Sequence, residues 1–103
     1  MSVRRYVNVF IRKDIPLVDQ MVQIGHSCLL AGAAFDPRAK DFLHLYQVED
    51  ESELIRIMTE LDLACIMYRV FYEPGNASGD KLGYTSLATE PGAMLTGKTM
   101  YSP

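Results

Sequence analysis

Two polar side chains, Gln23 and His26, stand three residues apart in a segment of mostly apolar and small residues. Residues at this spacing point to the same side of a helix. The segment follows a run of β-forming residues, Tyr6 to Ile11, which ends in three charged residues at 12–14. Where a strand leads into a helix, the end of the strand and the start of the helix form a crevice that ligands favour. The pattern therefore predicts a candidate site that includes Gln23 and His26.

The residue patterns of other common chemistries do not occur in the chain. The glycines at 75, 79 and 83 do not join a strand to a helix, as a phosphate-binding loop requires. The two histidines, His26 and His44, form no zinc pair with the cysteines at a recognisable spacing. Neither Ser27 nor Cys28 sits in a nucleophile elbow. We therefore expect no metal and no cofactor.

The composition is typical of one domain spanning residues 1–103. Of the 103 residues, 49% are hydrophobic, as in ordinary globular domains. No apolar run approaches the ~20 residues that cross a bilayer, and the alternating N-terminal segment is typical of a strand rather than a signal peptide. Cys28 and Cys65 lack metal-type spacing, so we expect two buried free thiols and a reducing, cytoplasmic setting.

The charge balance limits the class of partner. Ten basic and thirteen acidic residues give a formal charge of −3 and a pI near 5.2, whereas nucleic-acid-binding domains often have a pI above ~9. Basic residues still gather in and around the first strand and after the first helix: Arg4, Arg5, Arg12, Lys13, Arg38 and Lys40. They are either solvated surface charges or a local contact to RNA, which would be modest and salt dependent.

Hydrophobic periodicity and breaker residues predict six elements. Strands are expected at 6–11, 42–48, 65–72 and 84–88, and helices at about 16–34 and 50–61. Asp14 ahead of Pro16 resembles a helix entry with a capping carboxylate. Asp50 and Glu53 resemble a capping box.

The order β-α-β-α-β-β predicts an α/β fold: a single three-layer domain with a mixed four-stranded sheet and helices packed on it. The second helix carries an apolar core stripe, Leu54, Ile57, Met58 and Leu61. Small residues of the first helix suggest close packing against the sheet: Gly25, Ser27, Cys28, Ala31 and Gly32. A short edge segment is expected at 99–102.

Taken in order, these segments resemble a known family. The residues Ile-Arg-Lys-Asp-Ile at 11–15, followed by Gln23-x-x-His26, look like the opening of the archaeal and eukaryotic type 2 peptidyl-tRNA hydrolases. Thr-Ser-Leu-Ala-Thr-Glu-Pro at 85–91 is similar to the family's Thr-Val-Leu-Ala-Ile-Gly-Pro strand, and Thr-Gly-Lys at 96–98 to its closing Thr-Gly segment. The resemblance covers nearly the whole chain.

The resemblance implies metal-independent hydrolysis of the ester that joins a peptide to the 3′ end of tRNA. It gives four candidate catalytic residues, Gln23, His26, Glu73 and Thr85, and we add Arg12, Lys13, Asp14 and Lys81 as candidate substrate-binding residues. Three positions depart from the family: Asp19 replaces a lysine, Glu73 an aspartate and Ala77 a threonine.

The departures have chemical consequences. A lysine at position 19 would stabilise a phosphate or an oxyanion, whereas Asp19 repels both. Glu73 keeps the carboxylate and can still orient a water, although a shift of ~1 Å can cost 10²-fold in rate. Lys13 or Lys81 could replace the missing lysine in space.

Each candidate also has a structural interpretation. His26 could be a core histidine bonded to backbone, Gln23 the cap of a neighbouring loop, and Glu73 a solvated turn residue. Thr85 is a good strand former, and Asp19 favours the helix dipole.

Two classes of function therefore remain. The first is a divergent type 2 peptidyl-tRNA hydrolase in which Glu73 and Thr85 position the water. The second is a catalytically inactive module of the same fold that binds a nucleotide, a tRNA end or a protein. The expected partner is peptidyl-tRNA or another nucleotide-containing ligand and not a membrane, and a homodimer through a helix or a sheet edge fits either class.

Overall fold

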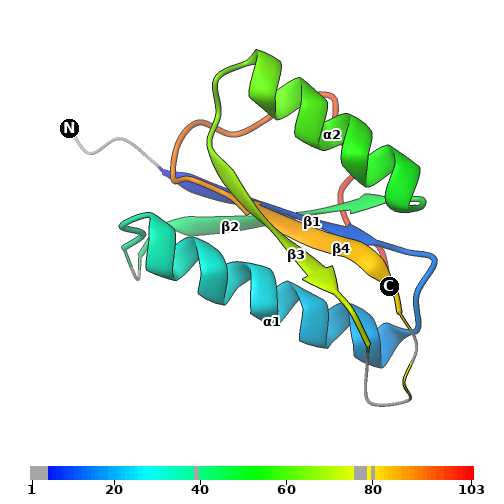
Figure 1. The fold of residues 1–103 in the computed structure, drawn as a ribbon. Coiled ribbons are helices and arrows are strands. Elements are labelled where there is room, and N and C mark those ends of the chain that lie inside the picture. Colours follow the sequence, from blue (N-terminus) through cyan, green and yellow to red (C-terminus); the bar gives the residue numbers. More distant parts are fainter. Residues whose placement is uncertain (1–4, 39, 76–78, 80) are drawn as a thin grey trace.

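A four-stranded mixed sheet forms the centre of the molecule (Figure 1). The computed structural model describes residues 5–38, 40–75, 79 and 81–103. The strands β1 (Tyr6–Arg12), β2 (Phe42–Val48), β3 (Tyr68–Glu73) and β4 (Gly83–Thr89) lie in the order β2-β1-β4-β3. β1 and β2 are parallel, and β4 is antiparallel to both β1 and β3. The C-terminal ends of β1, β2 and β3 therefore lie at the same end of the sheet as the start of β4.

One helix covers each face of this sheet. α1 (Leu17–Ala34) packs on β1, β3 and β4, and α2 (Glu51–Leu63) packs on β1, β2 and β4 from the other side. In Figure 1 they lie below and above the sheet. The predicted three-layer α/β fold with a mixed sheet is confirmed.

The two faces of the sheet are packed differently. The α2 side holds the larger apolar cluster, made by Phe10, Tyr46, Val48, Leu54, Ile57, Leu61 and Leu87, which confirms the predicted stripe on the second helix. The cluster on the α1 side is smaller: Val7, Val9, Ala31 and Ala88. There α1 also buries Gln20, Gln23 and Ser27. Buried polar groups need hydrogen-bond partners, so the α1 side must supply them.

The two helix starts turn out differently from one another. Asp50 caps α2 as predicted, because its carboxylate accepts from the backbone N–H of Glu53 (2.9 Å). The Glu53 carboxylate in turn accepts from the N–H of Glu49 (2.7 Å). The capping role predicted for Asp14 is wrong: Pro16 precedes α1 without a side-chain cap, and Asp14 binds Arg12 instead.

The connection between α2 and β3 departs from prediction. α2 continues to Leu63 and β3 begins only at Tyr68, three residues later than expected. Cys65 lies between them with a φ of 57°, a left-handed conformation unsuited to a strand. The prediction of two buried thiols is wrong for Cys65, which is exposed, whereas Cys28 is half-buried and burial raises the pKa of its thiol.

The predicted packing of small residues on α1 holds for only part of the set. Ser27 and Ala31 are buried against the sheet. Gly25 and Gly32 are exposed, and a Cβ added at either would meet no atom within 4 Å. These two glycines therefore do not serve the contact with the sheet.

The C-terminal segment lies along the outer edge of β2, as expected. The N–H of Gln47 donates to the carbonyl of Thr99 (2.9 Å), and the N–H of Tyr101 donates to the carbonyl of Leu45 (2.9 Å). One isolated bridge joins Tyr46 to Met100. The last residues thus extend the sheet by a short, irregular pairing.

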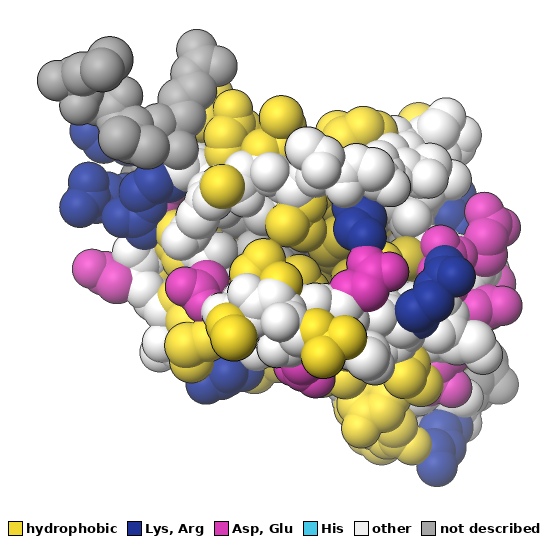
Figure 2. Space-filling model, turned by 90° about the horizontal axis from the view of Figure 1, so that it is seen from above, with side chains coloured by type: hydrophobic (Ala, Val, Ile, Leu, Met, Phe, Trp, Pro, Cys, Tyr) yellow, Lys and Arg dark blue, Asp and Glu magenta, His cyan; other side chains and the backbone are white. Residues whose placement is uncertain are grey.

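The face of the molecule that carries α2 mixes hydrophobic, basic and acidic side chains (Figure 2). Figure 2 shows basic side chains gathered at the end where the chain begins, with both signs and hydrophobic groups mixed elsewhere on this face. Within the described residues, no helix is long and apolar enough to cross a membrane.

Candidate active site

Three of the four predicted catalytic side chains meet in one hydrogen-bonded chain. Gln23 on α1 donates through Nε2 to Oε2 of Glu73 at the end of β3 (3.0 Å), and its Oε1 accepts from Oγ1 of Thr85 on β4 (3.0 Å). Gln23 and Thr85 are 0% exposed, and Glu73 is 8% exposed. Glu73 is therefore not a solvated turn residue, and Gln23 joins a helix to two strands instead of capping a loop.

The orientation of the Gln23 amide follows from its partners. An ionised carboxylate only accepts hydrogen bonds, so the NH₂ group must face Glu73 and the carbonyl oxygen must face the Thr85 hydroxyl. The backbone is fixed as well, because Oγ of Ser86 donates to the carbonyl oxygen of Gln23 (2.7 Å). α1 is thus held on β4 at the turn that carries the site.

The Glu73 carboxylate is held in its charged form. The pKa of Glu73 is lowered mainly by the hydrogen bond from Gln23, then by the backbone N–H of Gly75 and the charge of His26, with desolvation opposing them. The N–H of Gly75 donates to Oε1 (3.1 Å). Each oxygen thus accepts one of these bonds, and a carboxylate has about four acceptor sites. This group is able to orient a water.

His26, the fourth predicted residue, lies next to this chain of bonds. Its ring stacks on Phe71 of β3, with centroids 4.3 Å apart and planes at 8°. The residue is half-buried. Its charge also acts on Glu73, so His26 belongs to the same neighbourhood. The ring contact is this stacking, and not the backbone hydrogen bond of the core-histidine interpretation.

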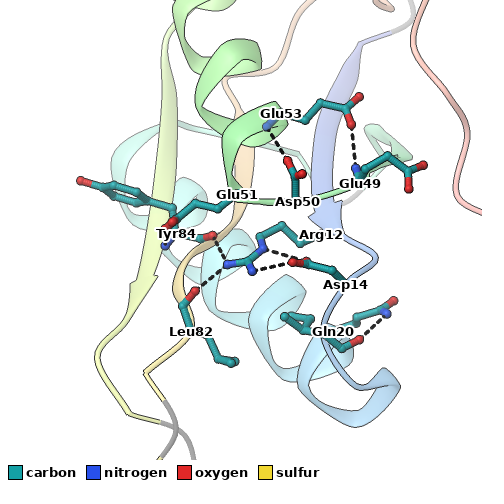
Figure 3. A network of polar contacts seen from close by, with 10 residues as sticks. Arg12, Asp14, Gln20, Glu49, Asp50, Glu51, Glu53, Leu82 and Tyr84 are labelled. Carbon is teal, nitrogen blue, oxygen red and sulfur yellow. Dashed lines mark hydrogen bonds and ion pairs between the residues drawn. The ribbon is translucent and has the colours of Figure 1, made fainter.

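Arg12 has a structural role that the sequence did not indicate. Its guanidinium lies between Asp14 and the first residues of β4 (Figure 3). Nε and Nη2 donate to the two oxygens of Asp14 (2.9 and 2.8 Å), and Nη1 donates to the carbonyls of Leu82 and Tyr84 (2.5 and 3.0 Å). The hydrogen bonds that Arg12 donates to Asp14 are the main cause of the raised pKa of Arg12, which burial opposes. These donors are used inside the fold, and a substrate contact by Arg12 or Asp14 stays a prediction.

Glu51 holds the same segment from the other side. Its Oε2 accepts from the backbone N–H of Tyr84 (2.7 Å). Gly83 lies against this carboxylate with a φ of 78°, and a Cβ there would come within 2.2 Å of Oε2. Arg12 and Glu51 together fix the start of β4 and thereby the position of Thr85. No sequence pattern pointed to Glu51, since its partner is a backbone group.

The predicted lysines contact residues outside this chain of bonds. Lys13 donates through Nζ to the carbonyl of Ser102 and lies 4.3 Å from the centre of the Tyr101 ring. The ammonium of Lys81 lies 5.6 Å from the centre of the Tyr72 ring. A replacement of the family's lysine by either residue stays a prediction.

The predicted basic residues do not form one patch. Arg5 precedes β1 and forms an ion pair with Asp41 (3.3 Å), whereas Arg12 is the last residue of β1 and lies at the opposite end of the strand. Arg38 and Lys40 precede β2 and therefore lie toward the end of Arg5. Arg4 lies outside the described residues, as does Ala77, the position of the family's threonine.

Asp19 occupies the first turn of α1, half-buried. There its charge favours the helix dipole, as one interpretation of the sequence expected. Among the residues that the structure describes, no group of three histidines, cysteines or carboxylates could hold a metal ion.

Replacing Glu73 with glutamine should change the pH dependence of stability. A lowered folded-state pKa stabilises the protein above the unfolded value of 4.5, and this contribution is lost as the pH falls through the folded value. We expect the wild type to melt at a higher temperature than Glu73→Gln at pH 7, and the difference to shrink below pH 4.5 and vanish once the pH is below the folded-state pKa of Glu73. Melting curves from pH 7 to pH 3 measure it. Glu49→Gln, which removes an exposed carboxylate, is the control, and a difference that stays constant with pH would contradict the expectation.

No family model matches the chain, and a search of curated proteins finds no match.

Proposed function

We propose that this chain is an ester hydrolase of the type 2 peptidyl-tRNA hydrolase kind, with Glu73 orienting the attacking water. The observation that supports the proposal is the hydrogen-bonded chain of Gln23, Glu73 and Thr85. It brings three residues named by the family resemblance to one place, from elements up to 62 residues apart.

The proposed reaction uses the charged carboxylate. Water bound to Glu73 attacks the ester carbonyl, the bond to the ribose oxygen breaks, and the water proton passes through Glu73 to that oxygen. The products are a peptide carboxylate, a free ribose hydroxyl and one proton, which is released to solvent. Gln23 and Thr85 act as positioning residues, because they hold the carboxylate in one orientation.

A second candidate is a binding module of the same fold without turnover. It is favoured by the charge at position 19, where a lysine of the family would stabilise the oxyanion and Asp19 would repel it. It is also favoured by Lys13, whose ammonium is bound to the C-terminal segment. In that case the site holds a nucleotide, a tRNA end or a protein.

The test is release of the acylated amino acid from N-acetyl-aminoacyl-tRNA. We expect turnover by the wild type, a loss of about 10²-fold or more in Glu73→Gln, and no change in Glu49→Gln. Asp19→Lys should raise the rate by roughly 10-fold or more, and Asp19→Asn by less, because only lysine supplies a positive charge.

The outcomes separate the two candidates. Turnover that survives in Glu73→Gln overturns the proposed mechanism. No turnover at high protein concentration, with deacylated tRNA bound and released by salt, supports the binding module. If the protein shows neither turnover nor binding of tRNA, the hydrolase is overturned, and a free nucleotide or a protein remains as the partner of the second candidate.

A further inference from the structure

The outward face of α1 is apolar and exposed to solvent. Val18 and Leu29 are 71% and 73% exposed, and Met21 is 66% exposed. Asp19 is the one Asp, Glu, Lys or Arg residue among the 18 residues of α1. α2 differs, because five of its 13 residues are of these types. The face of the molecule that carries α2 shows both signs of charge (Figure 2).

The outward residues of α1 follow the spacing of a coiled-coil seam. Val18, Val22, Gly25, Leu29 and Gly32 are separated by steps of four, three, four and three, and all five are exposed. Alternation of three and four keeps side chains on a stripe that faces a partner helix. The sheet is contacted by a different stripe, which contains Gln23, Ser27 and Ala31. The seam therefore has no partner among the described residues of the chain.

Close packing within the described part of the chain does not explain the two glycines of this stripe. A glycine inside a helix makes the helix less stable than an alanine at the same position does. Neither Gly25 nor Gly32 has a positive φ, and a Cβ added to either would meet open space. Close approach of a second helix is a reason for glycine that does remain, because a missing side chain lets two backbones come together.

A second copy of the same helix fits this stripe. If two copies of α1 run antiparallel with Gly25 at the two-fold axis, residues whose numbers add up to 50 face each other. Val18 then faces Gly32, Met21 faces Leu29, and Gly25 faces Gly25. A valine thus lies opposite a glycine at each end of the seam, two glycines meet at its centre, and no charges of like sign meet there. An interface of this kind is self-complementary, as two-fold symmetry requires.

The exposed area is close to what a dimer needs. The large exposed apolar side chains on and beside the seam are Leu17, Val18, Met21, Val22 and Leu29. Together they expose on the order of 600 Å² per copy, compared with the ~800 Å² that each partner buries in a standard interface. A monomer seldom shows a continuous apolar patch above a few hundred Å².

We propose that two copies of this protein form a homodimer through antiparallel packing of α1 around Gly25. The proposal does not depend on the proposed function, because the seam faces away from the sheet while Gln23 faces toward it.

The test is the mass of the protein in solution, measured by sedimentation equilibrium between 1 and 100 μM. We expect the mass of two chains for the wild type. Leu29→Lys places a charge in the seam and should raise the dissociation constant at least 100-fold. Leu63→Lys changes a residue of α2 that is 82% exposed and should leave the dimer intact. Gly25→Leu should also give monomers, and it should keep the fold because its side chain enters open space in a single chain.

A cross-linking experiment tests the direction of the helices. Val18→Cys and Gly32→Cys are prepared separately with both native cysteines changed to alanine. An antiparallel seam predicts that a disulfide joins the two proteins when they are mixed and oxidised, and that neither variant cross-links alone. A monomeric wild type at 100 μM, or a dimer that survives both Leu29→Lys and Gly25→Leu, overturns the proposal. Binding of a monomer to phospholipid vesicles would instead assign this face to a membrane surface.

Discussion

Replacing Arg12 with methionine is expected to lower the free energy of unfolding by about 3 kcal/mol. Methionine keeps much of the apolar length of the side chain but removes every donor. The carbonyls of Leu82 and Tyr84 then lose a charged partner, and Asp14 loses both of its bonds. The Asp14 side chain is 38% exposed, so water partly replaces Arg12 there, and most of the loss comes from the two carbonyls. Urea denaturation followed by circular dichroism measures the change.

Two further variants separate charge from geometry. Arg12→Lys keeps the charge but cannot reach Asp14 and two carbonyls in the same fork arrangement, so we expect roughly half of the loss. Arg38→Met removes an exposed arginine and should change stability by less than ~0.5 kcal/mol. An Arg12→Met protein as stable as the Arg38→Met control would show that the start of β4 is held by other contacts.

Replacing Gln23 with leucine is expected to cost about 2–3 kcal/mol. Leucine has a similar volume, so the loss reports the hydrogen bonds rather than a cavity. Oγ1 of Thr85 loses its 3.0 Å acceptor and keeps only a longer contact of 3.4 Å to the carbonyl of Phe71. Glu73 loses the donor on Oε2. The same urea denaturation measures the change.

A double-mutant cycle tests whether the cost belongs to the bond. Thr85→Val removes the hydroxyl with little change of shape, and the double variant Gln23→Leu/Thr85→Val leaves no unpaired group between the two positions. We expect the double variant to be about 1 kcal/mol more stable than the sum of the single losses predicts. Additive losses would mean that the two side chains are not coupled.

The parts of the fold that could be predicted have strong local signals. β2 was predicted with its observed bounds, Phe42–Val48, because its β-forming residues lie between polar breakers. The cap formed by Asp50 and Glu53 uses groups only three residues apart. Asp14 carried a similar local signal, but Arg12 competes for its carboxylate once the chain is folded. The late start of β3 depends on the left-handed conformation of Cys65. Cysteine is not a residue type from which a left-handed conformation is predicted.

The candidate site could be predicted only in part. The family resemblance named Gln23, Glu73 and Thr85, which the structure brings together. Spacing alone could not group them, since they come from α1, β3 and β4. The contacts that hold the start of β4 were not predicted, because Arg12 and Glu51 bind backbone atoms there. Nearly every residue carries the same backbone donor and acceptor, so the residue types do not show which backbone groups will be bound.

The pairing of the C-terminal segment with β2 bears on how this protein avoids aggregation. An open sheet has two edges, and an exposed edge can recruit a strand of another molecule into a growing fibril. The backbone of Thr99 and Tyr101 already occupies hydrogen-bonding groups on the outer side of β2. The other edge, β3, has an irregularity between Phe71 and Tyr72 and an exposed arginine, Arg69, two features that discourage strand addition. The last residues thus occupy the part of the β2 edge at Leu45 and Gln47, which reduces the free backbone that a strand of another molecule could pair with.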